Sequence, residues 1–138
     1  STALLNTTIQ RLFSFQWTLY RFTFPSLSSV NSTGTVSFRG GLASLDTIEI
    51  DRVMLSANPS ITLMNGDFES NSLVGTSSKY MNPFGWICGN IVNNVSGCVI
   101  VKSGDKTWGG GAAPHGNYYL ALQQRSVVSQ IIAVPMLH

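Results

Sequence analysis

The sequence predicts an all-β protein that folds as one two-sheet β-sandwich. No long window shows apolar residues at helical spacing, whereas β-branched and aromatic residues are frequent. Several short alternating segments are separated by Gly, Pro, Asn and Ser turn signals, a pattern typical of sandwiches. At 138 residues, the chain is long enough for one domain with a core and too short for two ordinary ones.

The first expected strand covers residues 17–24. Tyr20, Phe22 and Phe24 alternate along it and share one face, so we expect these rings in the core. Pro25 ends the strand because proline cannot donate a ladder hydrogen bond.

Two further strands are expected at residues 35–39 and 46–55. In the earlier of these, Val36 and Phe38 face inward. In the later one the inward apolar positions change parity midway, which predicts a bulge near Asp51.

Residues 61–86 open the second part of the chain. Asn65-Gly66 is a strong turn signal, and Phe68 and Trp86 are large enough to start a core. Asn58-Pro59 marks the seam, which divides the single domain into residues 1–57 and residues 61–138.

The last part of the chain predicts strands at 99–101, 118–123 and 126–134, with a Gly-rich loop at 104–116. The resulting core prediction is Tyr20, Phe22, Phe24, Phe38, Ile50, Val53, Phe68, Trp86, Leu120 and Leu122.

The composition favours a secreted protein. Only 10% of the residues are charged, against about 25% in an average soluble domain, and uncharged polar residues replace them. A net charge of +2, with Lys and Arg scattered singly, argues against a nucleic-acid partner. No apolar run reaches the roughly 18–20 residues that span a membrane.

The sequence shows no catalytic constellation. His115 lies in a loop and His138 is the last residue, with no Ser/His/Asp order and no G-x-S-x-G motif. No two acidic residues are paired as glycoside hydrolysis requires. We therefore expect a protein that is not an enzyme.

Cys88 and Cys98 flank a short polar loop. A metal site would need nearby His or further Cys, and a redox pair would need C-x-x-C spacing. The two remaining interpretations are a pair of buried thiols and a disulfide. We favour the disulfide, which would stabilise the fold by about 2–3 kcal/mol.

Three glycosylation sequons begin at Asn6, Asn31 and Asn94, whereas Asn58 is blocked by Pro59. Asn31 lies in a polar turn and Asn94 at the tip of the cysteine loop, so both are expected to be exposed and glycosylated, with Asn6 as a third candidate.

Trp108 precedes three glycines in a loop, where its ring could stack on a sugar. Tyr118 and Tyr80 are weaker candidates for the same role. The alternative is that Trp108 folds down over the edge of the sandwich.

The order of these signatures resembles a galactose-binding-like jelly-roll domain, found in extracellular carbohydrate-binding modules and in plant-wall-type domains of unknown function. In this chain, however, the half that resembles the end of such a domain comes before the half that resembles its beginning. The first of these carries Trp17-x-x-Tyr20-x-Phe22-x-Phe24, Val36-x-Phe38, Leu45-Asp46 and Ile50-Asp51-Arg52-Val53-x-Leu55. The second carries Leu63-x-Asn65-Gly66-Asp67-Phe68-Glu69, Pro83-x-Gly85-Trp86, Pro114-x-Gly116-x-x-Tyr119-Leu120-x-Leu122 and Val128-Ser129-Gln130-x-Ile132.

The resemblance implies a jelly-roll-like sandwich and suggests a structural calcium ion as a cofactor. Asp51, Asp67 and Glu69 fall where related modules often hold a structural calcium ion, which prefers carboxylate oxygens. The alternative is that Asn-Gly-Asp is only a turn. No other cofactor is expected.

The inverted order of the halves leads to the functional prediction. Either the chain is a permuted monomer, or its halves complete the sandwiches of neighbouring chains by strand exchange. In the second case the protein is an extracellular structural subunit that polymerises head-to-tail with copies of itself. The competing function is a carbohydrate-binding module whose partners are glycans.

Overall fold

The computed structural model of the protein describes residues 16–21, 23, 32–40, 47–56, 61–71, 73, 75–90, 97–123 and 125–134. Apart from one short 3-10 turn, all regular structure in these ranges is β-strand, so the all-β prediction is confirmed. The elements are β1 (Ser32–Arg39), β2 (Thr47–Ile50), β3 (Ser78–Tyr80), β4 (Ile87–Asn90), β5 (Cys98–Lys102), η1 (Lys106–Trp108), β6 (Tyr118–Gln123) and β7 (Ser126–Val134).

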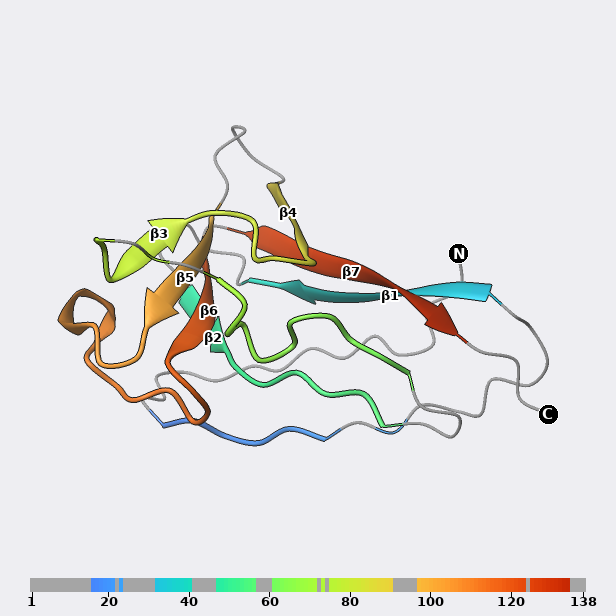
Figure 1. Ribbon diagram of the computed structural model, residues 1–138, viewed down its shortest axis with the longest axis horizontal. Helices are drawn as coiled ribbons and strands as arrows, with labels where there is room; N and C mark the ends of the chain where they lie inside the picture. Colours follow the sequence, from blue (N-terminus) through green and yellow to red (C-terminus); the bar gives the residue numbers. More distant parts are fainter. Residues whose placement is uncertain are drawn as a thin grey trace.

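These strands form two antiparallel sheets that pack together as a sandwich (Figure 1). Sheet A has the order β1-β7-β4, and sheet B has the order β2-β6-β5-β3. β1 pairs with β7 from Ser32 opposite Val134 to Arg39 opposite Val127, and β2 pairs with β6. Strands from the two halves therefore pair within one chain, so strand exchange is not needed to join them.

The core between the sheets is built around two aromatic rings. The ring centroids of Phe68 and Trp86 are 5.7 Å apart, and Phe38 lies 6.2 Å from Trp86. Burying each large apolar side chain contributes roughly 1.5–3 kcal/mol. The buried members of this cluster are Phe68, Trp86, Cys98, Ile100, Leu120, Leu122 and Val128.

The core prediction is confirmed for most of its members. Phe68, Trp86, Leu120 and Leu122 are buried, and Phe38, Ile50 and Val53 are partly buried and pack against them.

The prediction of a strand at residues 17–24 is wrong for the residues that the structure describes. Residues 16–21 and 23 carry no strand pairing, and Tyr20 is 42% exposed instead of buried. Trp17 packs edge-on against Tyr119, with ring centroids 5.4 Å apart. Trp17 therefore packs on the outer face of sheet B and not in the core between the two sheets. Phe22 and Phe24 lie outside the described residues.

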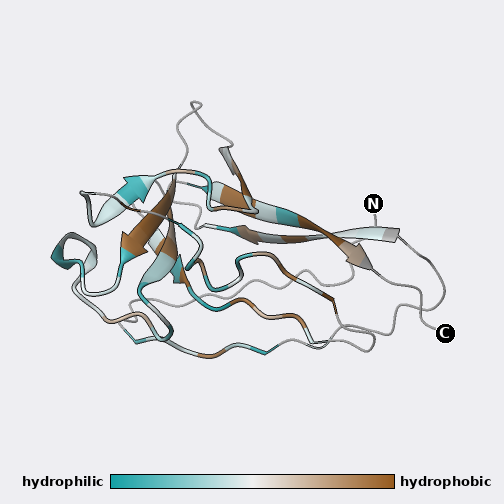
Figure 2. Ribbon diagram, in the orientation of Figure 1, coloured by the Kyte–Doolittle hydropathy of each residue, from teal (hydrophilic) through white to brown (hydrophobic). Residues whose placement is uncertain are grey.

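Sheet B is buried on both faces of its central strands. Trp17, Trp108 and Ala113 pack against a second cluster on the face turned away from sheet A. This cover explains why β5 and β6 read as nearly continuous apolar runs and not as an alternation (Figure 2). The buried residues of this outer cluster are Val99, Val101, Tyr119 and Ala121.

The Asn65-Gly66 turn is confirmed. Asn65 adopts a positive φ of 49°, and the Val53 N–H donates a 2.7 Å hydrogen bond to the Gly66 carbonyl. A Cβ at Gly66 would overlap the Val53 carbonyl oxygen, so only glycine allows this approach.

The strand expected at residues 46–55 ends at Ile50, so the predicted bulge near Asp51 is wrong, although the parity of the inward residues does change there. Ile50 packs toward the core and ends β2, and Val53 packs toward the core from the coil that follows. Between them Arg52 has a φ of 53°, which reverses the alternation without a continuing strand.

Gln130 joins the coil around Met64 to β7 from within the sandwich. Its Oε1 accepts from the Met64 N–H at 2.7 Å, and its Nε2 donates to the carbonyls of Met64 at 2.8 Å and Gly85 at 2.9 Å. The side chain is only 6% exposed, so this amide supplies bonds that a neighbouring strand would otherwise make.

Candidate functional site

The hydrogen-bond phase of sheet A determines which main-chain groups face outward. The Gly40 N–H donates to the Ser126 carbonyl at 2.9 Å, one step beyond the Arg39–Val127 pair. Hydrogen-bonded pairs alternate in an antiparallel ladder, so the even-numbered residues of β1 bond to β7. The odd-numbered residues of β1 direct their N–H and C=O groups to the opposite side.

That opposite side is the open edge of β1, formed by Thr33, Thr35, Ser37 and Arg39. No strand among the described residues pairs with it. All four side chains are exposed, only Arg39 is charged, and the strand contains no proline. The edge therefore has a single charge, at Arg39, and none of the prolines that commonly protect edge strands.

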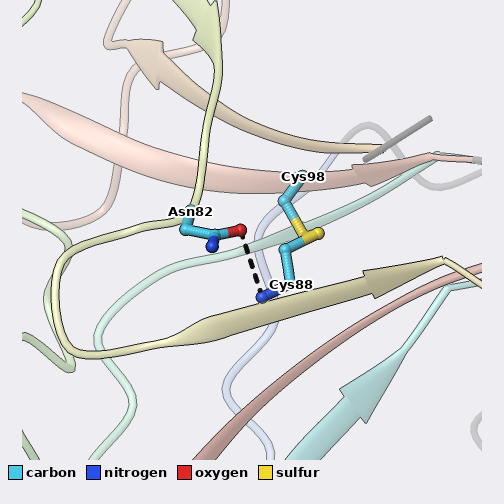
Figure 3. The surroundings of a disulfide bond; sticks show 3 residues. All are labelled: Asn82, Cys88 and Cys98. Carbon is cyan, nitrogen blue, oxygen red and sulfur yellow. Dashed lines mark hydrogen bonds between the residues drawn. A yellow bond between two sulfur atoms is a disulfide. The ribbon is translucent and has the colours of Figure 1, made fainter. Parts of the chain in front are cut away.

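The other edge of sheet A is protected. β4 is only four residues long, and the Cys88 N–H, which points away from β7, donates to Asn82 Oδ1 at 3.3 Å (Figure 3). The disulfide between Cys88 and Cys98, with Cα atoms 6.1 Å apart, ties this strand to sheet B. The predicted disulfide is confirmed, and the side chain of Asn82 occupies the Cys88 N–H, one of the outward donors that an added strand would use.

β7 has an exposed edge of its own, because β4 covers only part of it. β4 pairs with residues 126–129, whereas β7 continues to Val134. By the same alternation, Ile131 and Ala133 turn their N–H and C=O groups to the side of β4, past its end. We call residues 131–133 on this side the β7 shoulder.

The face of sheet A around the shoulder is apolar. Ile131 is 66% exposed, and Ile87 at the start of β4 is 60% exposed. Ile87 is opposite Ser129, so Ile131 is its diagonal neighbour on the same face. Sheet A therefore presents two exposed isoleucines beside unpaired main-chain groups.

The three predicted sugar-stacking residues do not form one platform. Trp108, half-buried at the end of η1, and Tyr80, 57% exposed, lie toward the outer face of sheet B. The Tyr80 hydroxyl donates to Gln123 Oε1 at 2.7 Å. Tyr118 packs on the other side, against the core between the sheets.

The three predicted calcium ligands bind backbone amides. Glu69 Oε1 accepts from the N–H groups of both Asn117 and Tyr118 at 2.8 Å. Asp67 Oδ1 accepts from the Glu69 N–H at 3.2 Å. Within the described ranges, no three His, Cys, Asp or Glu side chains are grouped as a metal site. The calcium prediction therefore gains no support from this geometry.

Asp51 and Glu69 instead anchor the loop that enters β6. Asp51 Oδ2 accepts from the His115 N–H at 3.0 Å. Gly116 has a φ of 67°, and a Cβ there would overlap the Glu69 carboxyl group. The loop sequence His115-Gly116 was the only local signal for these anchors, because their partners are far away in sequence.

A shallow cavity of about 360 Å³ lies beside this loop, with Arg52, Asp67 and His115 in its wall. Asp51 Oδ1 and His115 Nδ1 are buried and have no hydrogen-bond partner among the described residues. Burial raises the pKa of Asp51, and the hydrogen bond from the His115 amide opposes this rise. The cavity mixes charged, polar and apolar walls and contains no recognisable catalytic arrangement within the described residues.

The remaining predicted sites are not described. Asn6, Asn31 and Asn94 lie outside the described residues, so glycosylation stays a prediction. In the part of the chain that the structure covers, no helix is long and apolar enough to cross a membrane.

Comparison with known proteins gave no match to a family model, a curated protein or a solved structure. The resemblance to galactose-binding-like domains therefore stays a prediction.

Proposed function

We propose that the chain is an extracellular structural subunit that assembles with copies of itself by strand addition to sheet A. The observation that carries this proposal is the open edge of β1, which extends along an eight-residue strand. Main-chain hydrogen bonds to an added strand supply affinity at such an edge, and the alternating side chains supply specificity.

The other edges of the sandwich are poorer acceptors. β2 has four residues and β3 has three, which limits the ladder that either could form. β4 is short, and its outward Cys88 amide is bound to Asn82. Only β1 combines length with an edge that no described strand covers.

The mode of assembly differs from the strand exchange expected from the sequence. Both halves already pair within one chain, through β1 with β7 and β2 with β6. A neighbour would therefore add to a joined sandwich and would not need to complete a missing half. If the two surfaces in contact differ, the assembly is head-to-tail and grows into a filament.

An extracellular location fits the chemistry of the chain. The disulfide between Cys88 and Cys98 persists in oxidising compartments. Charged residues make up 10% of the sequence, and the three sequons at Asn6, Asn31 and Asn94 are consistent with a secreted glycoprotein.

The proposal is tested by placing a charge on the open edge. Thr35→Lys adds a cation at an exposed position of β1 and leaves its backbone unchanged. Thr62→Lys makes the same exchange at an exposed threonine outside the strands. Light scattering after size exclusion, together with negative-stain microscopy, should show fibres for the wild type and Thr62→Lys only. A wild type that stays monomeric at every concentration would rule the proposal out.

Carbohydrate binding is the second candidate function, favoured by the exposure of Tyr80 beside the outer face that Trp108 covers. Tyr80→Ala and Trp108→Ala should then weaken binding on a glycan array, whereas Phe84→Ala, at an equally exposed ring, should not. An array without hits for the wild type would remove this candidate.

A further inference from the structure

We infer that the open edge of β1 pairs with the β7 shoulder of a neighbouring copy. This inference rests on the proposed self-assembly and names the partner surface. Both surfaces lie on one two-stranded ribbon: β1 and β7 are paired over eight positions, and β4 covers β7 only at residues 126–129. In Figure 1 the ribbon continues past the end of β4.

The two surfaces are complementary in their hydrogen bonding. Ile131 and Ala133 each direct one N–H and one C=O group to the shoulder side, as derived above from the Gly40–Ser126 bond. Thr33 and Thr35 direct theirs to the other side of the same ribbon. A short ladder between copies would pair these main-chain groups, with which no strand among the described residues pairs.

The side chains around both surfaces also suit a second copy. Thr33, Thr35 and Ser37 are small and uncharged, so they can lie beside the exposed Ile131 without burying a charge. Arg39 is the only charged residue of this edge. It lies at the end of β1, away from Thr33 and Thr35, which would pair with the shoulder of the neighbouring copy. An added strand would also cover apolar surface of Ile131, which is 66% exposed.

The contact is heterologous, and this determines the form of the assembly. The open edge and the shoulder lie on opposite sides of the ribbon. When one copy binds another, the growing assembly therefore still has a free open edge at one end and a free shoulder at the other. The ladder of one copy then continues into the next as β1-β7-β1-β7, and the assembly does not close by itself. β4 limits the overlap, because an added strand meets it beside Ile87.

Cysteine cross-linking of mixed variants tests the pairing directly. Thr35→Cys and Ala133→Cys are prepared as separate full-length chains, each with its native disulfide intact. Mild oxidation of the mixture should give about tenfold more cross-linked dimer than oxidation of either variant alone. Strong cross-linking of Thr35→Cys alone would show that two β1 edges meet symmetrically, which would overturn the inference.

A charge substitution separates this inference from the proposed function. Ile131→Lys should raise the concentration needed for assembly about tenfold or more. Leu19→Lys, at a residue that is 72% exposed and lies outside both sheets, should leave it unchanged. If Thr35→Lys prevents assembly and Ile131→Lys does not, the shoulder is not the acceptor, although self-assembly stands. If the wild type never assembles, both proposals fail.

Discussion

The substitution Gln130→Glu replaces one buried amide nitrogen with oxygen at nearly constant volume. The Met64 N–H keeps its acceptor, whereas the carbonyl oxygens of Met64 and Gly85 lose their donor. Each lost hydrogen bond costs about 1 kcal/mol, and a buried acceptor left without a donor costs about 1–3 kcal/mol. We expect the free energy of unfolding to fall by about 2–4 kcal/mol at neutral pH.

The loss should depend on pH in a defined direction. The introduced carboxyl group faces two carbonyl oxygens in a buried site, so its pKa in the folded state is raised above the unfolded value of about 4.3. Proton uptake therefore favours the folded variant. The deficit relative to the wild type should be smallest below about pH 4 and should grow as the pH rises through the folded-state pKa.

Urea denaturation followed by tryptophan fluorescence measures both effects, and Gln123→Glu is the matched control. At Gln123 the side-chain oxygen accepts from the Tyr80 hydroxyl, so a carboxylate can replace the amide without losing the bond. The control should change stability by less than about 0.5 kcal/mol. Equal losses in the two variants would refute the view that the donor role of the Gln130 amide holds Met64 and Gly85 to β7.

Three further variants have defined outcomes. Gly66→Ala should lower the free energy of unfolding in urea by about 2 kcal/mol or more, because the new Cβ overlaps the Val53 carbonyl. The double variant Cys88→Ala/Cys98→Ala should lose about 2–3 kcal/mol in the same assay, and an unchanged midpoint would contradict a structural role for the disulfide. Partial burial raises the pKa of Glu49 and outweighs the hydrogen bond with Tyr119 that lowers it, so the charged form destabilises the fold above that pKa. Glu49→Gln should therefore raise the melting temperature at neutral pH, with the gain disappearing below about pH 4, where the carboxyl is protonated in both states.

The strands that the sequence predicted best are those whose ends are marked by neighbouring residues in the sequence. The predicted strands 118–123 and 126–134 coincide with β6 and β7, because the polar residues 124 and 125 separate two apolar segments. The aromatic core around Phe68 and Trp86 was equally visible, since large rings beside a turn have few alternatives to burial.

The failure at residues 17–24 has a physical cause. A period of two shows which residues share a face, but it does not show whether that face meets the core or a second layer. Sheet B carries apolar residues on both faces, so Trp17 packs on the outer face while Tyr20 remains 42% exposed. The anchoring roles of Asp51 and Glu69 were missed for a related reason, because their backbone partners are 64 and 48 residues away in the chain.

The edges of sheet A could not be assigned from the sequence, because openness depends on strand order and hydrogen-bond phase. Once both are known, the two edges differ in kind. Asn82 binds the outward amide of β4, and the disulfide holds that strand in place. The longer β1 presents its odd-numbered amides without a partner strand in the described part of the chain. A sandwich that only had to avoid aggregation would gain most from protecting its longest edge, since the number of main-chain bonds to an added strand increases with length. A short edge with a bound amide, together with a long edge that no described strand covers, is the arrangement that the proposed head-to-tail polymer requires.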